Sequence, residues 1–201
     1  MLDNNLVSWT ILAAFLLFLI YTLIVVREEK QSFVDSAKSF AFKQFAFKIP
    51  SWWGLVEEKP NLIRWKRLDT RYDWEAKLEW QDYLDSAISI EEDFKNRIEI
   101  LQMVFDLDSS DILMPSHFKD RLEVQNGNLE LVRIEGTATQ EGVERCYLDA
   151  FLIRDHQRKQ TLFATSLSSV LNGLVEGPYF EDMMLNLKWT PRDTEESVLI
   201  N

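Results

Sequence analysis

The sequence predicts an α+β domain behind a single transmembrane helix, with one antiparallel β-sheet and helices flanking it. Three observations predict this class. Residues 6–26 carry no charged side chain. Residues 71–81 alternate between apolar and polar side chains, as in a strand with one buried face. The predicted elements follow as strands, helix, strands and helix, without the βαβ alternation of a parallel sheet. We expect four segments: a transmembrane anchor at 1–27, an amphipathic connector at 28–41, a soluble domain at 42–189 and an acidic tail at 190–201.

The stretch from Leu6 to Val26 is long enough to cross a bilayer. As a helix it would reach about 32 Å, against a hydrocarbon core of about 30 Å. Trp9 and Tyr21 are among its few polar side chains, and none is charged, so it offers no proton relay. A cleaved signal peptide is the alternative. Because residues 1–5 hold no Lys or Arg, the apolar run is too long and no A-x-A site follows, we expect a retained anchor.

Charge beside the span predicts its orientation. Only Asp3 precedes the span, whereas four basic residues follow within about 20 residues: Arg27, Lys30, Lys38 and Lys43. Flanks rich in Lys and Arg stay cytoplasmic, so we expect the N-terminus outside and the soluble domain in the cytoplasm. The opposite orientation is the alternative.

The rest of the chain is acidic. Asp3 and Arg27 cancel within residues 1–27, so the net charge of −11 lies in residues 28–201. Nucleic-acid binding needs clustered Lys and Arg, and we therefore expect no nucleic-acid partner. Cys146 is the single cysteine and cannot form an internal disulfide, which is compatible with a reducing compartment.

The first part of the soluble domain predicts a hairpin. Strands are expected at 42–49, ended by Pro50, and at 61–68 and 71–81. A tight turn between the last two would pair Trp65 with Trp74 on the buried face and Arg64 with Glu75 on the wet face. This register gives Glu75 a basic partner, so we expect a structural carboxylate there and not a catalytic acid or base.

The second part predicts a helix, a β-meander and a closing helix. Ser89 and Glu92 have capping-box spacing, and the apolar stripe that follows predicts a helix ending near 106–108. Residues 109–119 are expected to form an irregular lid, with a binding loop as the alternative. Strands are predicted at 129–139, 143–154 and 161–166, with turns at 126–127 and 140–142. The closing helix is expected from Pro178 to Trp189, after a loop bend at 173–177.

This order of elements resembles a known family. The run Phe45–Trp53 (FAFKIPSWW), the hairpin, the helix, the meander and the final Leu187-Lys188-Trp189 resemble the PsbP-like α/β/α domain over residues 42–189. That family is named for an extrinsic photosystem subunit and includes small binding and assembly proteins. The resemblance implies the same fold, and it assigns no functional residue.

The sequence shows no site for chemistry. Its glycines form neither nucleotide-binding pattern. His117 and His156 lie far apart and have no metal-ligand spacing. A Cys146–His156 nucleophile pair is conceivable, but a cysteine in a predicted buried strand is commonly a small core residue. We expect no catalytic residue, no cofactor and no metal.

Surface contact remains as the predicted function. Five residues in two Gly- and Pro-bounded segments are candidate partner contacts: Trp52, Trp53, Gly173, Tyr179 and Phe180. We interpret the chain as a non-enzymatic, single-pass accessory or assembly subunit that contacts other subunits of a membrane complex. The alternative is a tethered ligand-binding or enzymatic domain acting on a membrane-associated substrate, which a closed pocket above about 300 Å³ would favour. The sequence does not decide the oligomeric state.

Overall fold

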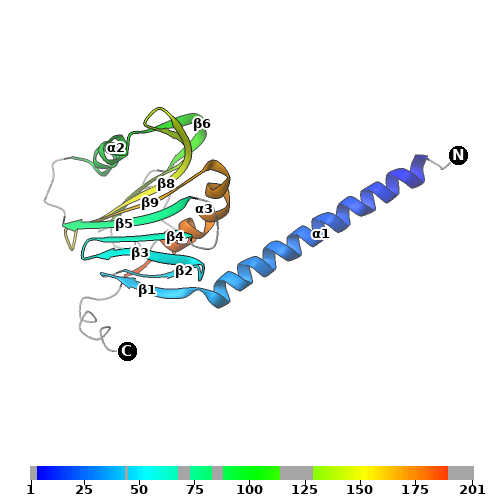
Figure 1. Ribbon diagram of the computed structural model, residues 1–201, viewed down its shortest axis with the longest axis horizontal. Helices are drawn as coiled ribbons and strands as arrows, with labels where there is room; N and C mark the ends of the chain where they lie inside the picture. The colour runs from blue at the N-terminus through cyan, green and yellow to red at the C-terminus, as the bar shows by residue number, and fades with distance from the viewer. Residues whose placement is uncertain (1–3, 44, 68–72, 83–87, 114–128, 190–201) are drawn as a thin grey trace. The chain divides into compact units, whose positions relative to one another are not determined.

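The computed structural model describes residues 4–43, 45–67, 73–82, 88–113 and 129–189 (Figure 1). The chain forms two compact units, residues 1–38 and residues 39–201. The first unit is essentially one helix. The second contains the domain expected at 42–189, and we call it the soluble unit after that expectation.

Helix α1 (Asn4–Ser36) is continuous through the uncharged stretch and beyond it. Its segment Val7–Phe33 has the length and composition needed to cross a membrane. Thr22 Oγ1 donates to the Phe18 carbonyl at 2.9 Å, the bond to the preceding turn that a threonine hydroxyl in a helix can make. The helix was expected to continue or restart as an amphipathic connector up to residue 41. Helix α1 continues to Ser36, and only Ala37 separates it from the first strand.

The soluble unit is built from two β-sheets and two helices within the residues described. The helices are α2 (Ile90–Ile100) and α3 (Val170–Leu185). The strands are β1 (Lys38–Phe42), β2 (Phe45–Ile49), β3 (Trp53–Lys59), β4 (Leu62–Arg67), β5 (Trp74–Asp82), β6 (Met103–Leu113), β7 (Leu129–Gln140), β8 (Glu144–Asp155), β9 (Gln160–Ser168) and β10 (Lys188–Trp189). The larger sheet is antiparallel, in the order β3-β4-β5-β9-β8-β7-β6, and the smaller has the order β1-β2-β10.

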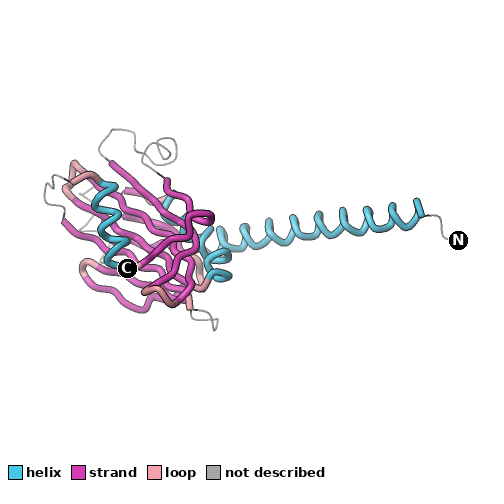
Figure 2. Tube along the Cα trace, turned by 90° about the horizontal axis from the view of Figure 1, so that it is seen from above, coloured by secondary structure: helices cyan, strands magenta, loops and turns pink. Residues whose placement is uncertain are grey.

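The larger sheet has a separate core on each face. Alternate side chains of β5, β7, β8 and β9 pack with α3 and the smaller sheet on one face, around Trp65, Phe151 and Phe180. Side chains of the opposite parity on β7, β8 and β9 pack with α2 around Phe94 and Leu152. Figure 2 shows the two helices on either side of the sheet. The predicted α+β class with an antiparallel sheet and flanking helices is therefore confirmed.

The smaller sheet was not predicted. The expected strand 42–49 is divided at Lys43, whose φ of +55° reverses the chain and creates β1 and β2. Strand β3 also begins at Trp53, inside the segment bounded by Pro50 and Gly54, where no strand was predicted. Proline ended the preceding strand as expected, but the chain re-entered a sheet after a single turn.

The predicted hairpin has the right faces and the wrong register. Trp65 pairs with Ala76, not with Trp74, and Arg64 pairs with Lys77, not with Glu75. Each pairing differs from the prediction by two residues, and a shift of two keeps every side chain on its own face. Alternation therefore could not distinguish the two registers. Glu75 still has basic neighbours, at 3.4 Å from Lys66 Nζ and 3.6 Å from Arg64 Nη1.

Helix α2 begins as predicted and ends earlier. Ser89 is its N-cap, and the Glu92 N–H donates to Ser89 Oγ at 3.2 Å. The helix ends at Ile100, and Gln102 has a φ of +55° before β6 starts. The expected lid was wrong over residues 109–113, which belong to β6, while residues 114–119 and the turn at 126–127 lie outside the described residues.

The meander is confirmed and the closing helix differs. Strands β7, β8 and β9 match the predicted strands to within two residues at each end, and Glu141 and Gly142 form the turn with positive φ. Helix α3 begins at Val170, so residues 173–177 are helical and Pro178 lies inside the helix. The predicted start at Pro178 and end at Trp189 were both wrong, because Lys188 and Trp189 pair with β2 as strand β10.

Candidate docking surfaces

Both candidate segments meet at one buried carboxylate on α3. Glu176 is only 1% exposed. It accepts hydrogen bonds from Trp53 Nε1 at 2.9 Å and Trp52 Nε1 at 3.3 Å, and its other oxygen pairs with Arg67. A buried carboxylate needs such partners to offset its desolvation. Glu176 therefore fixes the 52–53 turn against α3.

The aromatic candidates divide into core and surface residues. Trp53 and Phe180 are buried, with ring centroids 4.3 Å from Trp74 and 5.9 Å from Phe151 respectively. Trp52 and Tyr179 are half-buried and meet edge to face, with centroids 5.2 Å apart. Of the four aromatic candidates, only Trp52 and Tyr179 therefore present aromatic surface to a partner.

Gly173 allows α3 to lie close to the sheet. A Cβ at this position would lie 2.3 Å from Tyr147 Cγ on β8, a distance that side chains do not tolerate. At Gly177, one turn later, a Cβ would meet the same ring at an ordinary 3.6 Å. Gly173 is thus a packing residue beneath the helix and is not itself available to a partner.

The first turns of α3 are inverted relative to an ordinary amphipathic helix. Their buried side faces the sheet with small or polar residues: Asn172, Gly173, Glu176 and Gly177. Their opposite side, which we call the outer face of α3, consists of Leu171, Leu174, Val175 and Pro178, all exposed. The first three side chains are 54–77% exposed. The usual order is apolar side inward, so this apolar surface is a candidate docking surface.

A charged cluster supports the sheet under α3. Arg133 makes a two-pronged pair with Asp149, with Nε–Oδ1 and Nη2–Oδ2 both at 2.9 Å. It also contacts Glu135 and lies 2.9 Å from Glu181 Oε1 on α3. Burial raises the pKa of Asp149 to about 7, and the Arg133 guanidinium lowers that pKa against the effect of burial. The cluster links β7, β8 and α3 and has a structural role.

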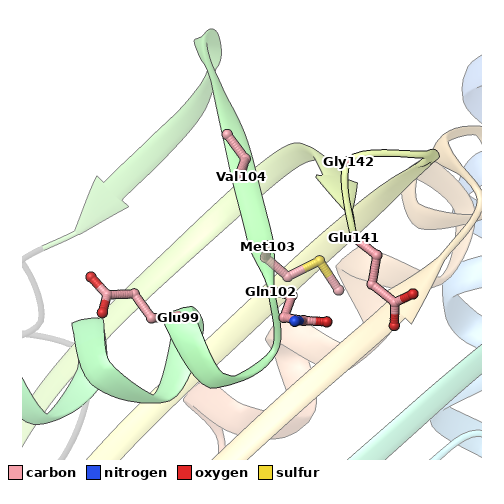
Figure 3. Close-up of a pocket in the computed structure, with 6 residues that line it drawn as sticks. All are labelled: Glu99, Gln102, Met103, Val104, Glu141 and Gly142. Carbon is pink, nitrogen blue, oxygen red and sulfur yellow. The ribbon is translucent and has the colours of Figure 1, made fainter.

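A second candidate surface lies beside the C-terminal end of α2. An open hollow of about 580 Å³ is lined by Glu99, Gln102, Met103, Val104, Glu141 and Gly142 (Figure 3). In this view the Glu99 and Glu141 carboxylates lie on opposite sides of the Met103 side chain. The Glu141 N–H donates to the Gln102 carbonyl at 3.1 Å, which joins the β7–β8 turn to the end of α2. We call this surface the α2 hollow.

Aliphatic side chains flank the α2 hollow. Three of them lie in or directly beside the segments that line it and are 67–89% exposed: Ile100, Val104 and Val143. The combination of apolar side chains and carboxylates suits a partner surface that is apolar and basic. Because the hollow is open, it does not match the enclosed pocket that would favour a tethered enzyme.

The residues considered for chemistry have structural surroundings. Cys146 and His156 lie at opposite ends of β8, about 30 Å apart at strand spacing, so they form no pair. Burial raises the pKa of the Cys146 thiol, which lies 3.4 Å from the Ala138 carbonyl. His156 Nε2 lies 3.1 Å from Glu130. Among the described residues, no group of three or more His, Cys, Asp and Glu could hold a metal ion.

One sequence signal points to the charged cluster, whose residues were not predicted as candidates. Asp149 is the lone charged residue in the apolar run 146–153. A buried carboxylate demands a cationic partner, which indicates that some Lys or Arg must reach it. The sequence does not show which Lys or Arg pairs with Asp149, because the partner, Arg133, lies on the neighbouring strand and not close in the chain. Glu176 gave no signal, because its segment was interpreted as a loop.

Comparisons with known proteins define the fold. The soluble unit resembles a mutant of the protein Mog1 and the Saccharomyces cerevisiae Ran-binding protein Mog1p, with TM-scores of 0.51 and 0.52 and identities of 10% and 8%. Each match covers 78% of this chain and 97% of the other. Cyanobacterial PsbP from Synechocystis matches with a TM-score of 0.51 and 13% identity, over 77% of this chain and 92% of that one. The fold is therefore PsbP-like.

Sequence comparison adds no family to this result. No protein-family model matches the chain, and no curated protein matches it.

Proposed function

We propose that this chain is a single-pass, membrane-anchored accessory or assembly subunit of a membrane protein complex. It is non-enzymatic and works through contacts that its soluble unit makes with other subunits. The Mog1p likeness is compatible with a binding role, since that protein is described as Ran-binding. The fold alone assigns no partner to this chain.

The proposed membrane attachment depends on α1. Its uncharged stretch is long enough for a bilayer, and the basic residues after it favour a cytoplasmic soluble unit. Val143 is exposed and gives a check on this orientation. A Val143→Cys variant in intact cells should react with a membrane-impermeant thiol reagent only after permeabilisation, and reaction beforehand would reverse the orientation.

The observation that carries the binding role is the α2 hollow. Apolar side chains as exposed as Ile100, Val104 and Val143 are costly to leave in water when they gather at one surface. Glu99 and Glu141 beside them favour a protein segment that combines apolar and basic side chains. Trp52 and Tyr179 remain proposed contacts at the α3 end of the unit.

Adding charge to the α2 hollow is expected to release the partner. The double variant Val104→Glu and Val143→Glu should weaken the complex at least tenfold, because two contacts worth about 1 kcal/mol each become desolvated carboxylates. The measurement is the native mass of the chain after gentle detergent extraction, with mass spectrometry of the proteins that co-migrate. We expect a complex for the natural chain and a monomer for the variant.

The matched control is the double variant Leu55→Glu and Val56→Glu. Both are exposed aliphatic residues on β3, away from the hollow, and the two changes add the same two negative charges. It should leave the complex intact. Recovery of the natural chain as a monomer with no companion protein would contradict the proposed function. An unchanged complex in the double variant of the hollow would show that the hollow is not the contact.

A further inference from the structure

The outer face of α3 lies at the end of the soluble unit where the chain arrives from α1. β1 and β2 are neighbours joined by only two residues, so they are antiparallel and the start of β1 lies beside the end of β2. Three residues after β2, Trp52 contacts Glu176 and Tyr179 of α3. Figures 1 and 2 show α3 and the start of β1 at the same end of the unit.

The length of the chain keeps this end near a membrane if α1 is the anchor. Helix α1 continues for ten residues after Val26, and Ala37 alone precedes β1. At about 1.5 Å per helical residue, the sheet begins less than about 20 Å from the end of the uncharged stretch. The polar layer on each side of a bilayer takes up about 5–8 Å of this distance. A unit of this size, roughly 40 Å across, then stands at the headgroup layer.

The composition of the face fits a lipid surface better than water. Leu171, Leu174, Val175 and Pro178 put no charge on the first turns of the helix, and the one acidic residue there, Glu176, is buried on the other side. Trp52 and Tyr179 lie next to this face as half-buried aromatic residues. Trp and Tyr favour the membrane–water interface, where an apolar ring and a polar atom are both satisfied.

We propose that the outer face of α3 rests on the lipid bilayer, so that Leu171, Leu174 and Val175 enter its interfacial layer. This inference rests on the proposed function, because α1 must first hold the unit at the membrane. The bilayer contact fixes which side of the soluble unit is turned away from the membrane. The α2 hollow lies across the sheet from α3 and is left open to a partner.

Spin-label accessibility tests the contact directly. The full chain is reconstituted in phosphatidylcholine nanodiscs, with Cys146→Ala and one nitroxide-labelled cysteine at Leu174, Val143 or Leu17. Collisions with oxygen, which concentrates in lipid, are compared with collisions with a water-soluble nickel chelate. The label at Leu174 should favour oxygen several-fold more than the label at Val143, an exposed site beside the α2 hollow. Adding Val175→Glu to the Leu174-labelled chain should lower that preference.

Each outcome has one meaning. A Leu174 label that prefers the nickel chelate as strongly as the Val143 label overturns the bilayer contact. Shielding of the Leu174 label from both reagents also overturns it, because a second copy of the chain then covers the face. The Leu17 label distinguishes this failure from failure of the anchor. If Leu17 does not prefer oxygen, α1 does not span the bilayer and the proposed function fails first.

Discussion

Replacement of Arg133 by Met is expected to destabilise the soluble unit by about 3–5 kcal/mol. Arg133 is 4% exposed and is the cation that Asp149, Glu135 and Glu181 share. Methionine keeps much of the volume but removes every hydrogen bond, so three carboxylates face one another under α3. The side chains of Glu135 and Glu181 are partly exposed to water, and that of Asp149 is buried.

The control for this variant is Arg145→Met. Arg145 also pairs with a carboxylate, at 2.6 Å from Asp106, but its side chain is 68% exposed. Water screens such a pair, and its loss should cost less than about 1 kcal/mol. Urea unfolding in mild detergent measures both. Equal losses for the two variants would contradict a structural role for the buried cluster.

The pH dependence of the Arg133→Met deficit has a definite sign. Burial raises the pKa of Asp149 to about 7 while Arg133 lowers it, so removal of Arg133 should raise that pKa further. Between the unfolded and the folded pKa of a carboxyl group, the folded state holds a proton that the unfolded state has released. The free energy of unfolding therefore falls as pH rises through this range, and it stops falling above the folded pKa. In the natural chain, the contribution of Asp149 to this fall ends near pH 7. The variant continues to lose stability, so its deficit should grow above about pH 7, by at most about 1.4 kcal/mol per pH unit.

Alanine at Gly173 and alanine at Gly177 are expected to have opposite effects. At Gly173 the new Cβ meets the rigid inner atoms of Tyr147 at 2.3–2.4 Å, so α3 must move from the sheet. Overpacking of this kind costs about 1–3 kcal/mol. At Gly177 the contact is ordinary, and the gain in helix propensity of up to about 1 kcal/mol should dominate.

The measurement is the change in thermal or urea unfolding of each variant. Both glycines lie in α3 and face the same tyrosine, so propensity and position are matched. In the Gly173→Ala background, Tyr147→Ala should recover part of the loss, since it removes the ring that the Cβ meets. A stabilised Gly173→Ala variant would contradict the close approach of α3 to β8.

Local sequence signals predicted the elements that depend on local contacts. The capping box at Ser89, the turn at Glu141-Gly142 and the burial of Trp74, Ala76 and Leu78 were all readable because each depends on residues close in the chain. The end of α2 was not, because Val104 and Phe105 fit a helical stripe and also belong to a strand. The helical position of Pro178 was not predictable either, because a proline inside a helix is unfavourable, and Pro178 lies in α3 on its exposed outer face.

The candidate docking surfaces also depend on contacts between residues that lie far apart in the chain. Trp52 and Trp53 were selected separately from the other candidates, for their aromatic and glycine content. The others are Gly173, Tyr179 and Phe180. The contact between the two groups depends on Glu176, whose hydrogen bonds reach across more than 100 residues. The sequence likewise could not show that the outer face of α3 is apolar, because that depends on which side of the helix the sheet covers.

Extraction of isolated membranes with alkaline carbonate tests the central claim most directly. Carbonate removes proteins that are held only at the surface and leaves transmembrane proteins in the pellet. A chain anchored by residues 6–26 should stay in the membrane pellet, whereas one held only by the contacts of its soluble unit should be released. We expect quantitative recovery in the pellet. Release of the chain into the carbonate supernatant would contradict the anchor and, with it, the role as a membrane-complex subunit.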